Sequence, residues 1–195
     1  MIKGIFERLY RIIFQPTKAW NTLVNEKEEE IIDNDSFFET YLYPIIGIVA
    51  LLTFVGALFH ESGFTVHNVQ LALKRMIGVA IALFAGFYLA SYLLSEIIVR
   101  FFSGDKQYKL CQRFVGYSSA LIYMMYMVLA IFPVFSFLSI FLLYTVYIVW
   151  EGIPAYIQIP ENEKNKFVII AAGIILLSPV LIEKILTLMM PNMKS

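Results

Sequence analysis

The sequence has few charged residues for its length. Charged residues make up 15% of its 195 residues, whereas a typical soluble domain carries roughly 25%. The hydrophobic residues reach 59% and the mean hydropathy is +0.73. A water-soluble globule with this composition would have too little polar surface to cover its apolar interior. The excess apolar surface is therefore predicted to face lipid.

Other absences exclude whole classes of function. The single cysteine, Cys111, rules out an internal disulfide framework and a cysteine-based metal cluster. The formal net charge is zero, so no strongly basic face is available for nucleic acid. The sequence has no G-x-x-x-x-G-K-[ST] phosphate loop. We expect no nucleic-acid partner, no cofactor and no enzymatic activity.

Long uncharged runs predict membrane-spanning helices. Thr40 to Phe59 contains no acid or base, and at 1.5 Å per residue it covers about 30 Å, the thickness of the hydrocarbon core. The uncharged run from Phe114 to Trp150 is too long for one crossing and is predicted to turn back at Pro133. The fold class is all-α, a polytopic membrane protein with five transmembrane helices at about 40–59, 76–99, 114–132, 134–156 and 167–190.

The basic residues predict the orientation of these spans. Most of them lie before the first span, between the second and third spans, and just before the fifth, and these segments share one side of the membrane: Lys3, Arg8, Arg11, Lys18, Lys27, Arg100, Lys106, Lys109, Arg113, Lys164 and Lys166. Cytoplasmic segments carry an excess of Lys and Arg. The N-terminus is therefore predicted to be cytoplasmic and the C-terminus to lie outside.

Residues 1–36 are predicted to form a cytoplasmic segment, and residues 37–195 the transmembrane domain. Apolar residues recur at helical spacing from Ile2 to Ile13, opposite Lys3 and Arg8. This pattern predicts an amphipathic helix that either lies in the membrane interface or packs on the cytoplasmic ends of the spans. The acidic run from Glu26 to Glu39 indicates a solvated linker, with a surface for a cation or a basic partner as the alternative.

Small residues recur every fourth position in the second span. They are Gly78, Ala82, Gly86 and Ala90, which lie on one helical face. Small side chains let helix backbones approach closely in a membrane. The strip predicts a close neighbour, either another span of the same chain or the second copy in a homodimer.

Acidic residues within the spans are the candidates for a polar site. Glu96 has Arg100 one turn further along, which favours an ion pair within the helix. Glu151 has no base within a turn and lies near the aromatic residues Tyr147, Trp150 and Tyr156. We expect Glu151 either to anchor its span at the interface or to form a polar site with Glu96, with Arg113 as the counter-charge.

Glu183 and Lys184 form a second charged position within a span. They follow Pro179 in the outer half of the fifth span, and neighbouring helical residues point about 100° apart. The sequence predicts either a kinked helix end or an outer polar site that includes His60, Glu61 or His67.

Several short patterns resemble one family, the Yip domain. They are Phe14-Gln15-Pro16-Thr17-Lys18-Ala19-Trp20, the acidic linker, Pro44, Gly116-Tyr117-Ser118, Pro133 and Trp150-Glu151-Gly152. The resemblance covers most of the chain and implies an all-α integral membrane protein. Eukaryotic members interact with Rab-type GTPases in vesicle traffic, and prokaryotic members mostly have no assigned activity. The short N-terminal segment implies a prokaryotic relative in the plasma (cell inner) membrane.

We therefore expect a non-enzymatic protein that organises membrane or partner proteins through its cytoplasmic face. Its predicted partner surface includes Pro16 and Trp20 in the N-terminal segment, with Lys106 and Lys109 in the basic loop. The alternative is a small transporter or channel for a cation, proton or lipid that uses Glu96 and Glu151.

Overall fold

The computed structural model describes residues 2–30, 34–60, 65–102, 108–157 and 159–189, and all regular structure in these ranges is helical. The elements in chain order are α1 (Ile2–Phe14), α2 (Pro16–Glu30), α3 (Asn34–Phe37), the π-helix η1 (Phe38–Leu42), α4 (Tyr43–His60), α5 (Val66–Phe101), α6 (Tyr108–Ser118), α7 (Ala120–Ile131), the 3₁₀-helix η2 (Pro133–Tyr144), α8 (Thr145–Tyr156) and α9 (Glu161–Met189).

Five segments are apolar and long enough to span a membrane. Four are continuous helical stretches: Asp35–His60, Val66–Phe101, Pro133–Pro154 and Glu161–Met189. The fifth is the pair α6 and α7, which is bent by 41° at Ser119. This arrangement confirms the predicted all-α, five-span fold. A helix satisfies its own backbone hydrogen bonds, which is why long apolar runs adopt it in lipid.

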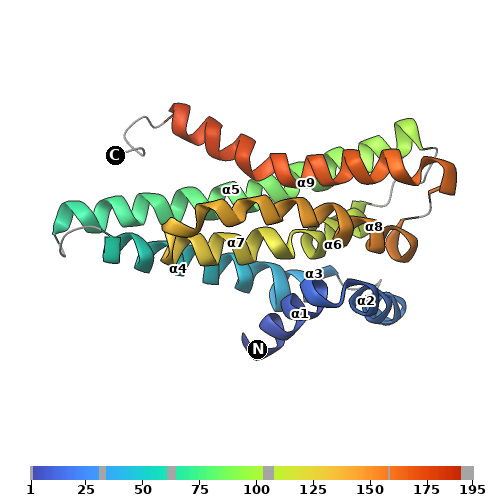
Figure 1. Ribbon diagram of the computed structural model, residues 1–195, viewed down its shortest axis with the longest axis horizontal. Helices are drawn as coiled ribbons and strands as arrows, with labels where there is room; N and C mark the ends of the chain where they lie inside the picture. The colour runs from blue at the N-terminus through green and yellow to red at the C-terminus, as the bar shows by residue number, and fades with distance from the viewer. Residues whose placement is uncertain (1, 31–33, 61–64, 103–107, 158, 190–195) are drawn as a thin grey trace.

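The spans lie roughly along one axis, and the N-terminal helices lie to one side of it (Figure 1). α5 packs along α9 and α4, while α4 also packs against α7. α1 lies closer to the middle of the bundle, and α2 lies near the end where α5 finishes and α9 begins (Figure 1). We call this end of the bundle the α2 end, and the opposite end, where α4 finishes, the His60 end.

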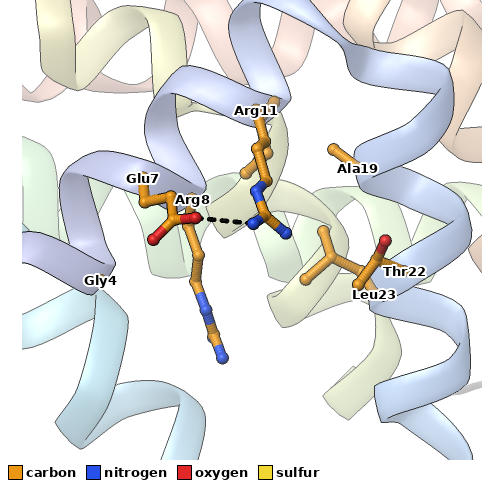
Figure 2. A pocket seen from close by; sticks show the side chains of 8 residues that line it. Gly4, Glu7, Arg8, Arg11, Ala19, Thr22 and Leu23 are labelled. Atoms are coloured by element: carbon orange, nitrogen blue, oxygen red, sulfur yellow. Dashed lines mark hydrogen bonds and ion pairs between the residues drawn. The ribbon is translucent and has the colours of Figure 1, made fainter.

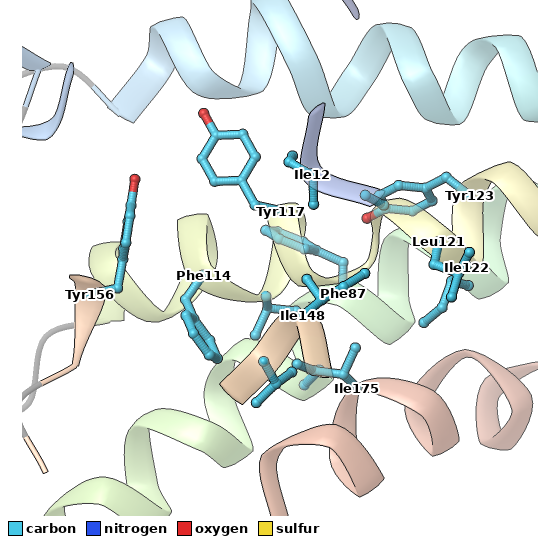
Figure 3. Close-up of a cluster of buried hydrophobic side chains, with 14 of the residues drawn as sticks. Ile12, Phe87, Phe114, Tyr117, Leu121, Ile122, Tyr123, Ile148, Tyr156 and Ile175 are labelled. Carbon is cyan, nitrogen blue, oxygen red and sulfur yellow. The ribbon is translucent and has the colours of Figure 1, made fainter. Parts of the chain in front are cut away.

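The bent span forms the centre of the α2 end. Every residue from Cys111 to Tyr123 is buried. Phe87, Phe114, Tyr117 and Ile148 converge there from three different spans, as Figure 3 shows. Four helices pack around α6 and α7 at this level, namely α1, α4, α5 and α8. The N-terminal helices and the spans therefore share one hydrophobic core.

The strip of small residues on α5 packs within the chain. Gly78, Ala82, Gly86 and Ala90 are all buried, and α5 packs more extensively against α9 than against any other described element. A Cβ atom added at Gly86 would lie 2.8 Å from the backbone N and Cα of Pro179. The predicted close neighbour is therefore α9 of the same chain, and a homodimer stays a prediction.

Two segments have local structure that the sequence did not predict. Around the acidic run, α2 continues to Glu30 and helical structure resumes at Asn34, while the solvation of this run stays a prediction. The chain does turn at Pro133, but the fourth span then begins with twelve residues of 3₁₀-helix, none of which is buried. Runs of 3₁₀-helix this long are uncommon, so η2 is the least regular of the spanning segments.

Candidate functional site

Trp20 holds the N-terminal helices on the spans. Its side chain is 1% exposed, and its indole Nε1 donates a 2.9 Å hydrogen bond to the carbonyl oxygen of Ile148. The indole stacks on Phe114 with ring centroids 5.6 Å apart and meets the edge of Tyr156 at 5.3 Å. A Cβ atom at Gly152 would lie 2.6 Å from the indole. Gly152 therefore leaves the space that Trp20 fills.

This packing corrects the predicted partner surface. Pro16 and Trp20 are buried inside the chain, so the prediction that they contact a partner is wrong. The pattern of a proline followed by a tryptophan suggested an exposed contact. In the structure, Gly152, Phe114 and Tyr156 enclose the Trp20 indole instead. Lys109 is exposed at the start of α6, and Lys106 lies outside the described residues.

α1 has a buried face and an exposed aromatic edge. Ile5, Leu9, Ile12 and Ile13 are buried, and α1 packs against α7. Of the two predicted arrangements, the structure therefore has α1 packed on the spans. Phe6, Tyr10 and Phe14 remain exposed along one edge of the same helix.

The rings of Tyr10 and Phe14 lie 4.8 Å apart. Tyr and Trp are common at the level of lipid headgroups, where one part of the ring meets lipid and another part meets water. The packed position of α1 is therefore compatible with contact between its aromatic edge and the membrane interface.

A small cavity lies between α1 and α2 (Figure 2). Its volume is about 180 Å³, and it is lined by Gly4, Glu7, Arg8, Arg11, Ile12, Ala19, Thr22 and Leu23. Arg11 donates a 2.6 Å hydrogen bond to the Glu7 carboxylate, and both side chains are about half exposed. We call this the α1–α2 cavity. It combines two guanidinium groups, a carboxylate and a hydroxyl in a space large enough for a few polar atoms.

The sequence alone does not reveal this cavity. Arg8 and Arg11 lie on the polar face of an amphipathic helix, but no local pattern pairs that face with α2. The available signal was the helix break at Gln15-Pro16, because proline is favoured at the first position of a helix. Such a break predicts two helices meeting at an angle, with a space between them.

Glu96 forms the ion pair that its spacing predicts. Its carboxylate lies 3.5 Å from Nε of Arg100, one turn further along α5. The side chain of Arg100 is 72% exposed and that of Glu96 is 22% exposed. An exposed pair of this kind contributes about 0–1 kcal/mol to stability. The ion pair predicted within α5 is therefore present.

Glu151 and Arg113 lie on elements that pack against each other. Glu151 is half-buried on α8, and Arg113 is buried on α6. The neighbouring Trp150 ring receives the ammonium group of Lys164 at 4.4 Å from its centroid. α6 and α9 both pack against α5 and against α8. α5 and α8 carry Glu96 and Glu151, and the polar site that these two acids were expected to form stays a prediction.

The bend in the third span carries polar groups that the core surrounds. The Ser119 hydroxyl donates a 2.8 Å hydrogen bond to the carbonyl oxygen of Val115, a bond of the kind that often bends helices. The hydroxyl oxygens of Tyr41, Ser118 and Thr145 are buried without a hydrogen-bond partner among the residues described. Within those same ranges, no group of three His, Cys, Asp or Glu side chains is placed to hold a metal ion.

Comparison with known proteins adds one finding. A family model described as the Yip1 domain matches residues 10–182, most of the chain. No curated protein matches the sequence, and no solved structure matches it.

Proposed function

We propose, given that this chain belongs to the Yip1 domain family, that it is a non-enzymatic membrane protein which organises other proteins through the surface formed by α1 and α2. The observation that carries this proposal is the rigid attachment of these helices. The hydrogen bond from Trp20 to Ile148 fixes α2 on the spans, and the buried face of α1 fixes the first helix. The polar sides of both helices are left facing outward.

The α1–α2 cavity suggests the chemistry of the partner. Arg8 and Arg11 outnumber Glu7 among the charged residues that line it. A guanidinium group binds carboxylates through paired, charge-assisted hydrogen bonds. We infer that the partner presents an acidic side chain to this cavity and that α1 and α2 contact the surrounding segment.

The test is site-specific cross-linking in intact cells. A photo-reactive residue replaces Thr22, which lines the cavity, and in a control it replaces Asn165, which is exposed at the start of α9. We expect a discrete protein adduct from position 22 alone, identified by mass spectrometry and reduced at least about tenfold by Arg8→Glu. Lys166→Glu is the matched charge reversal outside the cavity and should leave the adduct unchanged.

Two results would contradict the proposal. Identical adducts from positions 22 and 165 would mean that the cavity selects no partner. Ion flux in proteoliposomes that disappears in Glu151→Gln would favour the transporter, which nothing in the described residues supports at present.

We further infer that the protein lies in the plasma membrane. We infer that its α2 end is cytoplasmic because most bases lie on the segments at that end. A reporter fused after Ser195 should then lie outside the cell. A cysteine introduced at the exposed Thr65 in a Cys111→Ser background should react with an impermeant probe. Protection of both positions from external reagents would reverse the orientation.

A further inference from the structure

Two adjoining cavities open at the His60 end, in the half of the bundle away from the α1–α2 surface. Their volumes are about 400 and 380 Å³, within the range that ligand pockets occupy. Both are lined by Thr53 of α4, Val79 of α5, and Val180 and Glu183 of α9. Because they share these four residues, the two cavities adjoin each other, and we call the pair the crevice.

The first cavity is lined by charged and hydroxyl side chains together with apolar ones. Arg75 of α5 and Lys184 of α9 line it with Glu183 and Thr187. Charged side chains at the ends of spans commonly reach toward the headgroup level.

The second cavity is apolar and lies deeper between the spans. Ile122, Met125, Leu129, Leu142 and Leu176 line it. Where the two cavities meet, the Tyr126 hydroxyl donates a 3.3 Å hydrogen bond to the Glu183 carboxylate. One wall is η2, which has no buried residue and contributes Ser139 and Leu142 to the lining.

We propose that this crevice binds a membrane phospholipid of net charge −1, with its phosphate on Arg75 and Lys184 and an acyl chain in the apolar cavity. The lining changes from charged to apolar in the direction from the end of the bundle toward its middle, as a lipid does from headgroup to chain. Arg75 and Lys184 supply two cationic hydrogen-bond donors for the phosphate. This inference does not depend on the proposed function of the α1–α2 surface.

The first test measures lipid selectivity in the unmodified protein. Purified protein in detergent is incubated with equal amounts of phosphatidylglycerol and phosphatidylcholine, and bound lipid is counted by native mass spectrometry. We expect at least about threefold more bound phosphatidylglycerol. Equal binding of the two lipids by the parent protein would overturn the proposal without any variant.

The second test assigns the headgroup. The double substitution Arg75→Gln with Lys184→Gln removes both cations from the polar cavity. It should weaken phosphatidylglycerol binding about tenfold, the size of effect expected from losing charge-assisted hydrogen bonds. The matched control is Lys164→Gln with Lys166→Gln at the other end of α9, which should retain the preference. Equal losses in both double variants would contradict the assignment.

The third test separates a lipid from a free anion. Leu142→Trp should fill the apolar cavity and reduce phosphatidylglycerol binding, whereas the same change at Leu143, which is 65% exposed on η2, should not. Inorganic phosphate added at equal concentration should fail to displace the lipid. Displacement by inorganic phosphate, or an equal loss in both tryptophan variants, would show that the acyl chain does not occupy the crevice.

Discussion

The crossing of α5 and α9 gives the most direct test of the packing. Gly86 lies at this crossing, and the closest atoms to an added Cβ belong to the backbone of Pro179, at 2.8 Å. Carbon atoms pack best at about 3.5–4.0 Å. A backbone cannot rotate away as a side chain can, so Gly86→Ala must move α9 by about 1 Å.

The expected cost follows from two terms. Extra volume in a packed core destabilises by about 1–3 kcal/mol, because separating the helices weakens dispersion contacts along their length. Replacing a helical glycine by alanine also contributes about 0.5–1 kcal/mol of stability, through the backbone entropy of the unfolded chain. Gly173→Ala on α9 supplies the second term alone, since nothing lies within 4 Å of a Cβ at Gly173.

The difference between the two variants therefore measures overpacking. We expect Gly86→Ala to be less stable than Gly173→Ala by about 1–3 kcal/mol, or a lower Tm by roughly 2–12 °C for a chain of this size. Thermal unfolding in detergent, followed by circular dichroism, would measure it. Equal melting temperatures would refute the close crossing. Leu83→Ala is a poor reference because Leu83 is itself buried and its truncation leaves a cavity.

Two further substitutions test the anchor and the isolated acid. Trp20→Ala should lower the free energy of unfolding, measured by SDS titration, by about 3–5 kcal/mol. The control Trp150→Ala removes a partly exposed ring and should lower it by less than half as much. Equal losses would contradict the anchoring of α2 by Trp20. Glu151→Gln should change stability by no more than about 1 kcal/mol in either direction, measured by thermal melts at pH 5 and pH 8, and a larger loss would mean that its charge is used structurally.

The number of spans and their positions could be predicted because lipid imposes simple rules. An uncharged run of about 20 residues has few alternatives to a membrane-spanning helix. Proline at the centre of a run too long for one crossing marks the turn, as Pro133 does. The small-residue strip on α5 predicted a close neighbour for the same reason, although only the structure identifies that neighbour as α9.

The position of Trp20 could not be predicted by the same means. Its hydrogen-bond acceptor, Ile148, lies 128 residues further along the chain, and no local pattern connects the two. Gly152 and Gly116 were read as parts of short motifs, whereas in the structure they leave room for Trp20 and for Phe37. Residues that look like independent motifs in the sequence are partners in one aromatic core.

The two ends of the bundle differ in their side-chain packing: large buried aromatic residues fill one end, and cavities lie at the other. The two proposed binding surfaces lie at different ends. The largest fully buried side chains include Trp20, Tyr41, Phe37, Phe114 and Phe167, which gather toward the α2 end. At the His60 end, η2 buries no residue and the crevice lies between the spans. A tightly packed half can hold α1 and α2 in a fixed orientation for a partner, because interiors at close packing transmit strain rather than absorb it. The cavities between the spans at the His60 end can admit a lipid without loss of the core. Substitutions at the α2 end should therefore reduce stability first, and substitutions around Glu183 should change lipid binding while the fold persists.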